Sequence, residues 1–183
     1  MASVDADPTL PDGGPTSERR PPRRPIARIV GVAGVVLVLD QLTKWWAIEA
    51  LADPPRVIDL VWTLRFNLLY NRGTAFSLTD DSGPIVSVIA VVVVVFLLRS
   101  GRQQRSSWVL LSYGLVVGGT VGNLADRVFR DSEGLLRGGV VDFVDPQWFP
   151  VFNLADTALT VGIVVLLLAG FLTDAFDEPD GSK

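Results

Sequence analysis

Long apolar runs constrain this chain more than any other feature of its sequence. Four such runs occupy residues 26–51, 76–98, 108–124 and 151–172. A helix needs ~20 apolar residues to cross the ~30 Å hydrocarbon core of a bilayer, and the third, shorter run can cross if protein shelters its polar end. The hydrophobic content of 49% and the mean hydropathy of +0.39 are also too high for a soluble domain of this size. The sequence therefore predicts an all-α integral membrane protein with four transmembrane helices.

The segments that flank these runs have a different composition. Residues 1–25 are rich in Pro, Gly, Asp and Arg and have no apolar periodicity, so we expect a disordered N-terminal extension. This extension is not expected to start a cleavable signal peptide, because the apolar run after it is too long and contains Asp40 and Lys44. Residues 173–183 are expected to form a disordered C-terminal tail, which leaves residues 26–172 as the membrane domain.

Arginines predict the orientation in the membrane. They precede the first run and fill the short loop between the second and third runs, at positions 19, 20, 23, 24, 28, 99, 102 and 105. Because cytoplasmic loops carry an excess of Lys and Arg, we expect both termini in the cytoplasm. Residues 52–75 and 125–150 then face outward.

The first outward segment has the pattern of a strand. Residues 57–70 are rich in β-branched, aromatic and Leu residues, and Ile58, Leu60, Trp62, Leu64 and Phe66 alternate onto one face. We expect a short strand or hairpin on the outer membrane surface, which gives the fold a small extracytoplasmic β-containing segment between helices 1 and 2. The second outward segment, residues 128–139, is expected to be a short surface helix or loop.

Carboxylates and amides are the chemical groups on which a site can be built. The chain has no Cys and no His, which removes thiol nucleophiles, Ser-His-Asp triads and the usual zinc or haem ligands. The tetrapeptide Asn-Leu-Ala-Asp occurs twice, at residues 123–126 and 153–156, each time at the end of an apolar run. Ionisable groups at the margin of a span are by default functional candidates. The predicted topology brings Asp40, Lys44, Asp126 and Asp156 to one membrane level.

Each of these features also has a purely structural explanation. Asn153 and Asp156 can cap a helix, Asp126 can pair with Arg127, and Asp40 with Lys44 at i,i+4 favours an intramembrane salt bridge over catalysis. Gly118, Gly119 and Gly122 favour close helix packing, and residues 71–73 form a turn signal.

Two other functions are compatible with acids in membrane spans. A cation- or proton-coupled transporter is one alternative, but four spans without an internal repeat, with acids at their ends, are sparse for it. A metal-dependent lipid-headgroup transferase is another, although its acids would cluster on one or two helices. Ion flux or chelator sensitivity would favour these alternatives.

Five motifs, taken together and in order, resemble the lipoprotein signal peptidase (signal peptidase II) family. The resemblance covers about residues 26–172. The motifs are Asp-Gln-Leu-Thr-Lys at 40–44, Asn-Arg-Gly-Thr-Ala-Phe-Ser at 71–77, Gly-Gly-Thr-Val-Gly-Asn-Leu-Ala-Asp-Arg at 118–127, Val-Val-Asp-Phe at 140–143 and Phe-Asn-Leu-Ala-Asp at 152–156.

The resemblance implies an aspartic endopeptidase of the bacterial inner membrane, a monomer among membrane lipids. Such an enzyme removes the signal peptide from a prolipoprotein just before a diacylglyceryl-modified cysteine. On matching positions it implies Asp126 and Asp156 as the catalytic pair, without metal or cofactor, since two close carboxylates can share one proton. The supporting residues implied are Asn71, Gly73, Asn123, Arg127 and Asn153, with Asp40 and Lys44 in structural or supporting roles.

Overall fold

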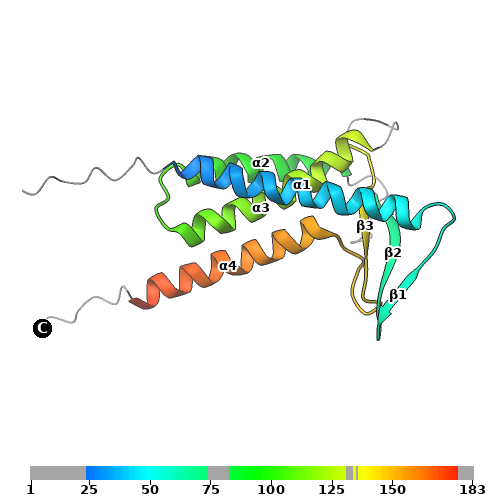
Figure 1. The fold of residues 1–183 in the computed structure, drawn as a ribbon. Helices are drawn as coiled ribbons and strands as arrows, with labels where there is room; N and C mark the ends of the chain where they lie inside the picture. The colour runs from blue at the N-terminus through cyan, green and yellow to red at the C-terminus, as the bar shows by residue number, and fades with distance from the viewer. Residues whose placement is uncertain (1–23, 74–82, 131–133, 135, 177–183) are drawn as a thin grey trace, which may run out of the picture.

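The computed structural model describes residues 24–73, 83–130, 134 and 136–176. Within these residues, four helices are long and apolar enough to cross a membrane, which confirms the predicted class. They are α1 (Pro25–Leu51), α2 (Gly83–Gly101), α3 (Ser107–Phe129) and α4 (Leu154–Phe176). Figure 1 shows them running along one common direction, with a small sheet at one end.

The helix bounds differ from the apolar runs in places. Residues 76–82 of the second run, and residues 1–23 and 177–183 of the expected extensions, lie outside the described residues. The α3 helix continues past residue 124 to Phe129, and α4 continues to Phe176, into the predicted tail. The segment 128–139 therefore begins as the last turn of α3.

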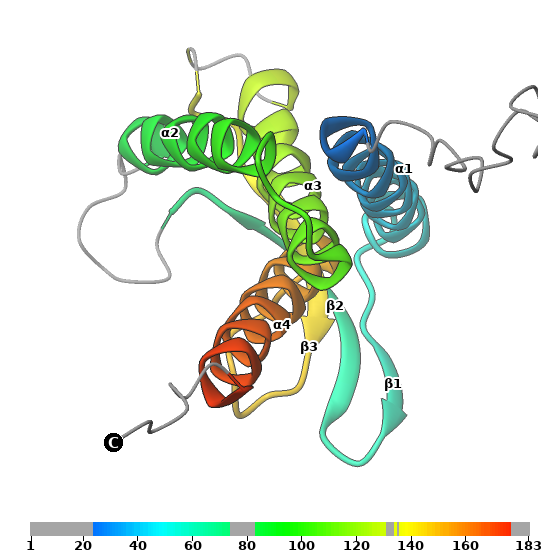
Figure 2. The ribbon, with the colours of Figure 1, turned by 90° about the vertical axis from the view of Figure 1, so that its left-hand side faces the viewer.

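The α3 helix is the central helix of the bundle (Figure 2). In its most apolar window 56% of the residues are buried, against 17% for each of the other three helices. Glycines explain this close packing, as predicted. A Cβ at Gly118 would lie 2.9 Å from the carbonyl oxygen of Ala33 in α1, and a Cβ at Gly119 would collide with the carbonyl oxygen of Ala155 in α4.

The sheet is antiparallel and lies at the end of the bundle where α1 ends and α4 begins (Figure 1). The predicted hairpin is present as β1 (Ile58–Val61) and β2 (Leu64–Asn71), and β2 also pairs with β3 (Val140–Asp145). The third strand was not predicted. It is the most buried of the three strands, with Val141 fully buried against the end of α1.

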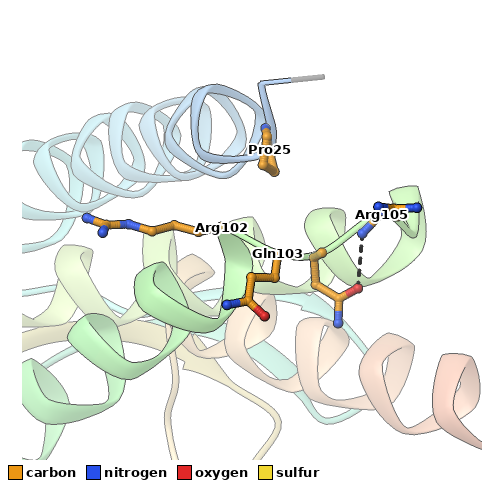
Figure 3. Close-up of a pocket in the computed structure, with 5 residues that line it drawn as sticks. Pro25, Arg102, Gln103 and Arg105 are labelled. Atoms are coloured by element: carbon orange, nitrogen blue, oxygen red, sulfur yellow. Dashed lines mark hydrogen bonds between the residues drawn. The ribbon is translucent and has the colours of Figure 1, made fainter. Parts of the chain in front are cut away.

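The other end of the bundle has a cavity of about 680 Å³. Figure 3 shows its lining where the start of α1 meets the α2–α3 loop: Pro25, Arg102, Gln103, Gln104 and Arg105. The two ends of the bundle therefore differ in chemistry, because the acidic motifs converge at the sheet end.

Candidate active site

Asp126 lies in the last turn of α3, fully buried, and is bonded on both carboxylate oxygens. Its Oδ1 accepts from Arg130 Nε at 2.6 Å and from Gln41 Nε2 at 3.2 Å. Its Oδ2 accepts from Lys44 Nζ at 2.9 Å and from the N–H of Val141 at 3.1 Å. Two cations and two amide donors therefore hold this carboxylate.

Lys44 is also fully buried, and its ammonium group has three acceptors. Nζ lies 2.9 Å from Asp40 Oδ2, 2.9 Å from Asp126 Oδ2 and 2.9 Å from Asn123 Oδ1. The predicted Asp40–Lys44 ion pair is thus present. Asp40 also accepts a hydrogen bond from the N–H of Ala155 at 3.0 Å, which ties α1 to the start of α4. We call Asp40, Lys44, Asp126 and Arg130 the ion-pair cluster.

Asp142, in the middle of β3, is a second buried carboxyl group with 1% of its surface exposed. Among the residues that the structure describes, its two oxygens accept hydrogen bonds from amides alone: from Asn153 Nδ2 at 2.6 Å and from Asn71 Nδ2 at 3.0 Å. Burial raises the pKa of Asp142 to about 6, and the negative charge of Asp156 adds to this effect against the opposing amide bonds. Asp142 therefore keeps its proton up to about pH 6, well above the range of an ordinary carboxyl group.

Asp156 lies in the first turn of α4 and is only partly buried. It accepts from Asn123 Nδ2 at 2.8 Å and from the N–H of Asn153 at 3.2 Å, while its own N–H donates to Asn153 Oδ1 at 3.0 Å. Asn153 thus caps α4, as the structural explanation of this motif predicts. Its side chain also donates to Asp142, so one residue links the two carboxyl groups.

Arg127 supplies positive charge to the same place. Its guanidinium has favourable electrostatic interactions with three carboxylates, of which the interaction with Asp142 is the largest and those with Asp156 and Asp126 are smaller. Within the described part of the chain, its buried Nε has no hydrogen-bond partner. A buried donor without a partner is costly, so Arg127 is suited to bind a group that enters from outside.

Asn71 is positioned by a turn at the end of β2. Gly73 has a backbone φ of +105°, and its N–H donates to Asn71 Oδ1 at 2.9 Å. The amide nitrogen of Asn71 is thereby directed to Asp142. The predicted turn is therefore present at these two residues.

The carboxyl groups are grouped differently from the prediction. We expected Asp126 to pair with Asp156, but Asp126 is bonded to Lys44 and Arg130, and Asp142 is the residue that shares Asn153 with Asp156. Asp142 belongs to the motif at 140–143 but was not among the predicted site residues, because its neighbours in the sequence are apolar. The signal was an acid at a strand position whose neighbours Val141 and Phe143 are core residues.

The fold and the site define a multi-pass membrane protein with a carboxyl–amide cluster at one end of its helix bundle. A family model described as signal peptidase (SPase) II matches residues 32–172. The chain belongs to the signal peptidase II family, a family of proteases.

Individual relatives agree with this assignment. The chain is 42% identical to a lipoprotein signal peptidase of Rhodococcus jostii, covering 83% of this chain and 75% of that protein. It is 38% identical to one of Mycobacterium avium, covering 93% and 92%. A solved bacterial membrane enzyme shares the fold with a TM-score of 0.70 and 23% identity, over 86% of this chain and 96% of that chain. The transporter alternative is not supported.

Proposed function

We propose that this protein is an aspartic endopeptidase that removes the signal peptide from diacylglyceryl-modified prolipoproteins, cleaving before the lipidated cysteine. The proposed catalytic pair is Asp142 and Asp156, in place of the predicted Asp126 and Asp156. The observation that carries the proposal is the pair of bonds from Asn153, whose side chain donates to Asp142 and whose N–H donates to Asp156.

The environments of the two carboxyl groups suit different roles. Asp142 is buried and has a raised pKa, so it is the group that holds the proton. Asp156 is partly exposed and accepts two N–H donors, so it is the ionised group that can meet a water molecule. The negative charge of Asp156 also opposes ionisation of Asp142.

The reaction then follows the general acid–base scheme of an aspartic peptidase. Asp156 takes a proton from water as the water oxygen bonds to the scissile carbonyl carbon, and Asp142 gives its proton to the carbonyl oxygen. In the second step the proton on Asp156 passes to the amide nitrogen as the C–N bond breaks. The proton on one hydroxyl of the intermediate returns to Asp142, and the new carboxyl group forms. One shared proton leaves the pair with a single negative charge, which Arg127 compensates.

Asp126 is poorly suited to this chemistry. Its carboxylate is bonded by Lys44 and Arg130, which favour its ionised form and occupy both oxygens. It is also fully buried, so water would have to displace these partners to reach it.

We further propose that the sheet end lies at the outer face of the bacterial cytoplasmic membrane, with both chain termini in the cytoplasm. The arginines at 99, 102 and 105 support this orientation, since they belong to the end of α2 and to the α2–α3 loop, which lies opposite the sheet (Figure 1). A single chain brings together all the side chains of the proposed site, so we propose that the enzyme acts as a monomer among membrane lipids.

Incubation of the purified protein with a diacylglyceryl-modified prolipoprotein tests this function. We expect the signal peptide to be released at an unchanged rate in EDTA and in thiol-blocking reagents, because the proposed mechanism uses only carboxyl groups. The matched control is the same precursor without its diacylglyceryl group, which should remain uncut. Inhibition by EDTA that a divalent ion reverses would favour a metal-dependent enzyme and overturn the aspartic mechanism.

A further inference from the structure

Asn123 lies between the ion-pair cluster and the proposed catalytic pair. Its Oδ1 accepts from Lys44 Nζ at 2.9 Å and from Asn153 Nδ2 at 3.1 Å. Its Nδ2 donates to Asp156 Oδ1 at 2.8 Å. One side-chain amide therefore connects a buried ammonium group to a catalytic carboxylate.

The ammonium group determines which way this amide faces. Lys44 can only donate hydrogen bonds, so it requires the carbonyl end of Asn123. A flipped amide would turn its NH₂ group towards the ammonium and its carbonyl oxygen towards the carboxylate of Asp156. Both contacts would then be repulsive, so Lys44 ensures that Asp156 receives a donor.

From these contacts we infer that Lys44 is a positioning residue that acts on the catalytic pair through Asn123. The inference rests on the proposed function, since it assigns a role toward the Asp142–Asp156 pair. The ion-pair cluster would then have a role in catalysis in addition to its role in joining two helices.

The surroundings of Lys44 fix its ammonium group in place. Asp40 and Asp126 accept its other two hydrogen bonds, so each ammonium proton has an acceptor. Arg130 binds Asp126 from the far side at 2.6 Å and donates to Gln41 Oε1 at 3.2 Å. The cluster has two acids and two bases, and this neutrality allows it to be buried.

The charged groups around Lys44 determine the direction of a pH effect. Asp40 faces it from α1, Asp126 from α3, Asp142 from β3, and Asp156 from α4 through Asn123. Arg127 and Arg130 contribute positive charge from α3. Loss of the ammonium removes a favourable charge for ionised Asp142 and the fixed donor for Asp156. Asp142 then ionises less readily, so the pH–activity profile moves to higher pH.

A double-mutant cycle on kcat tests the inference. Lys44→Met should lower kcat about tenfold or more, since hydrogen bonds to charged groups contribute roughly 1.5–3 kcal/mol. In an Asn123→Ala background the same substitution should change kcat by no more than about twofold, because the connecting amide is already gone. The matched control is Asn71→Ala, which removes an amide donor from Asp142 on the β2 side, away from Lys44. There the two effects should multiply.

A second control variant distinguishes the loss of the Lys44–Asn123 hydrogen bond from a general disruption of the ion-pair cluster. Asp40→Asn removes one partner of Lys44 but leaves its bond to Asn123, so its pH profile should not move upward. If Lys44→Met does not fold, the double variant Asp40→Asn with Lys44→Met removes one charge of each sign and takes its place. If activity falls below detection, the titration of ¹³C-labelled carboxyl groups should show the upward shift in the Lys44 variant only.

Two results would overturn the inference: multiplicative effects in the Lys44–Asn123 cycle, or an upward shift in Asp40→Asn equal to that in Lys44→Met. Failure of the proposed function is separate, because it would appear as cleavage by Asp142→Asn or Asp156→Asn. If both of those variants are inactive and the cycle is multiplicative, only the role of Lys44 is refuted.

Discussion

At the scale of single residues, two buried aspartates of this protein differ in the donors that surround them. Asp126 is bonded by an ammonium and a guanidinium group, whereas Asp142 is bonded by two neutral amides. Cations stabilise the ionised form of a buried carboxyl group, but neutral amides do so only weakly. The donors therefore support the proposed assignment of Asp126 to a structural role and of Asp142 to a catalytic one.

The stability of Asp142→Asn tests this difference. The folded pKa of Asp142 is raised from 3.8 to about 6, so the folded protein binds this proton more tightly than the unfolded chain. The stability that this proton contributes is full below about pH 4 and is lost as pH rises through about 6. At pH 7.5 the cost approaches about 3 kcal/mol, at ~1.4 kcal/mol per pKa unit. Asn cannot ionise, so the variant should unfold at a higher temperature than wild type at pH 7.5 and at a similar one at pH 4.

Asp145→Asn, in the same strand, is the matched control for thermal unfolding. Burial alone would raise the pKa of Asp145, but hydrogen bonds from Arg65 and Asn67 hold it below its ordinary value. Its ionised form is therefore stabilising at neutral pH, and the control should unfold at a lower temperature than wild type. An Asp142→Asn variant that loses stability at pH 7.5 as this control does would contradict the account.

At the scale of elements, hydropathy predicts the helices well because each helix satisfies its own backbone hydrogen bonds. The α3 helix extends past its apolar run because the charge of Asp126 is neutralised by Lys44 of α1 and by Arg130 one turn further on, which hydropathy does not detect. The β3 strand was missed because it depends on pairing with β2 across a long stretch of sequence. Because β3 was not predicted, the burial of Asp142 and its connection to Asp156 through Asn153 could not be predicted either.

The repeated tetrapeptide contributes three residues to the candidate site. Asn123, Asn153 and Asp156 all lie in the site, because helical spacing places an Asn and an Asp three residues apart on one face. Asp126, from the same pattern, is bonded instead by Lys44 of α1 and by Arg130. The packing of the helices and the sheet determines which carboxyl groups come together. A local sequence motif carries no information about that packing.

At the scale of the whole molecule, the small sheet and the α2–α3 loop lie at opposite ends of the bundle (Figure 1). The carboxyl cluster is at the sheet end, and the arginine-lined cavity is at the loop. The proposed orientation can be tested with single cysteines in this Cys-free chain. Gln103→Cys at the cavity end should react with a membrane-impermeant thiol reagent only after the membrane is opened. Asp59→Cys in β1 should react in intact spheroplasts. Both positions are exposed, and the reverse pattern would place the site at the cytoplasmic surface.

The most direct test of the central claim compares Asp142→Asn with Asp126→Asn in cleavage of a diacylglyceryl-modified prolipoprotein. Asp156→Asn serves as the inactive reference, and thermal unfolding of each variant confirms folding. Asp142→Asn should be folded and as inactive as the reference, because half of the catalytic pair is missing. Asp126→Asn should be less stable but retain measurable cleavage. Near-normal cleavage by Asp142→Asn, together with complete loss in a folded Asp126→Asn, would return the catalytic role to Asp126 and contradict the account.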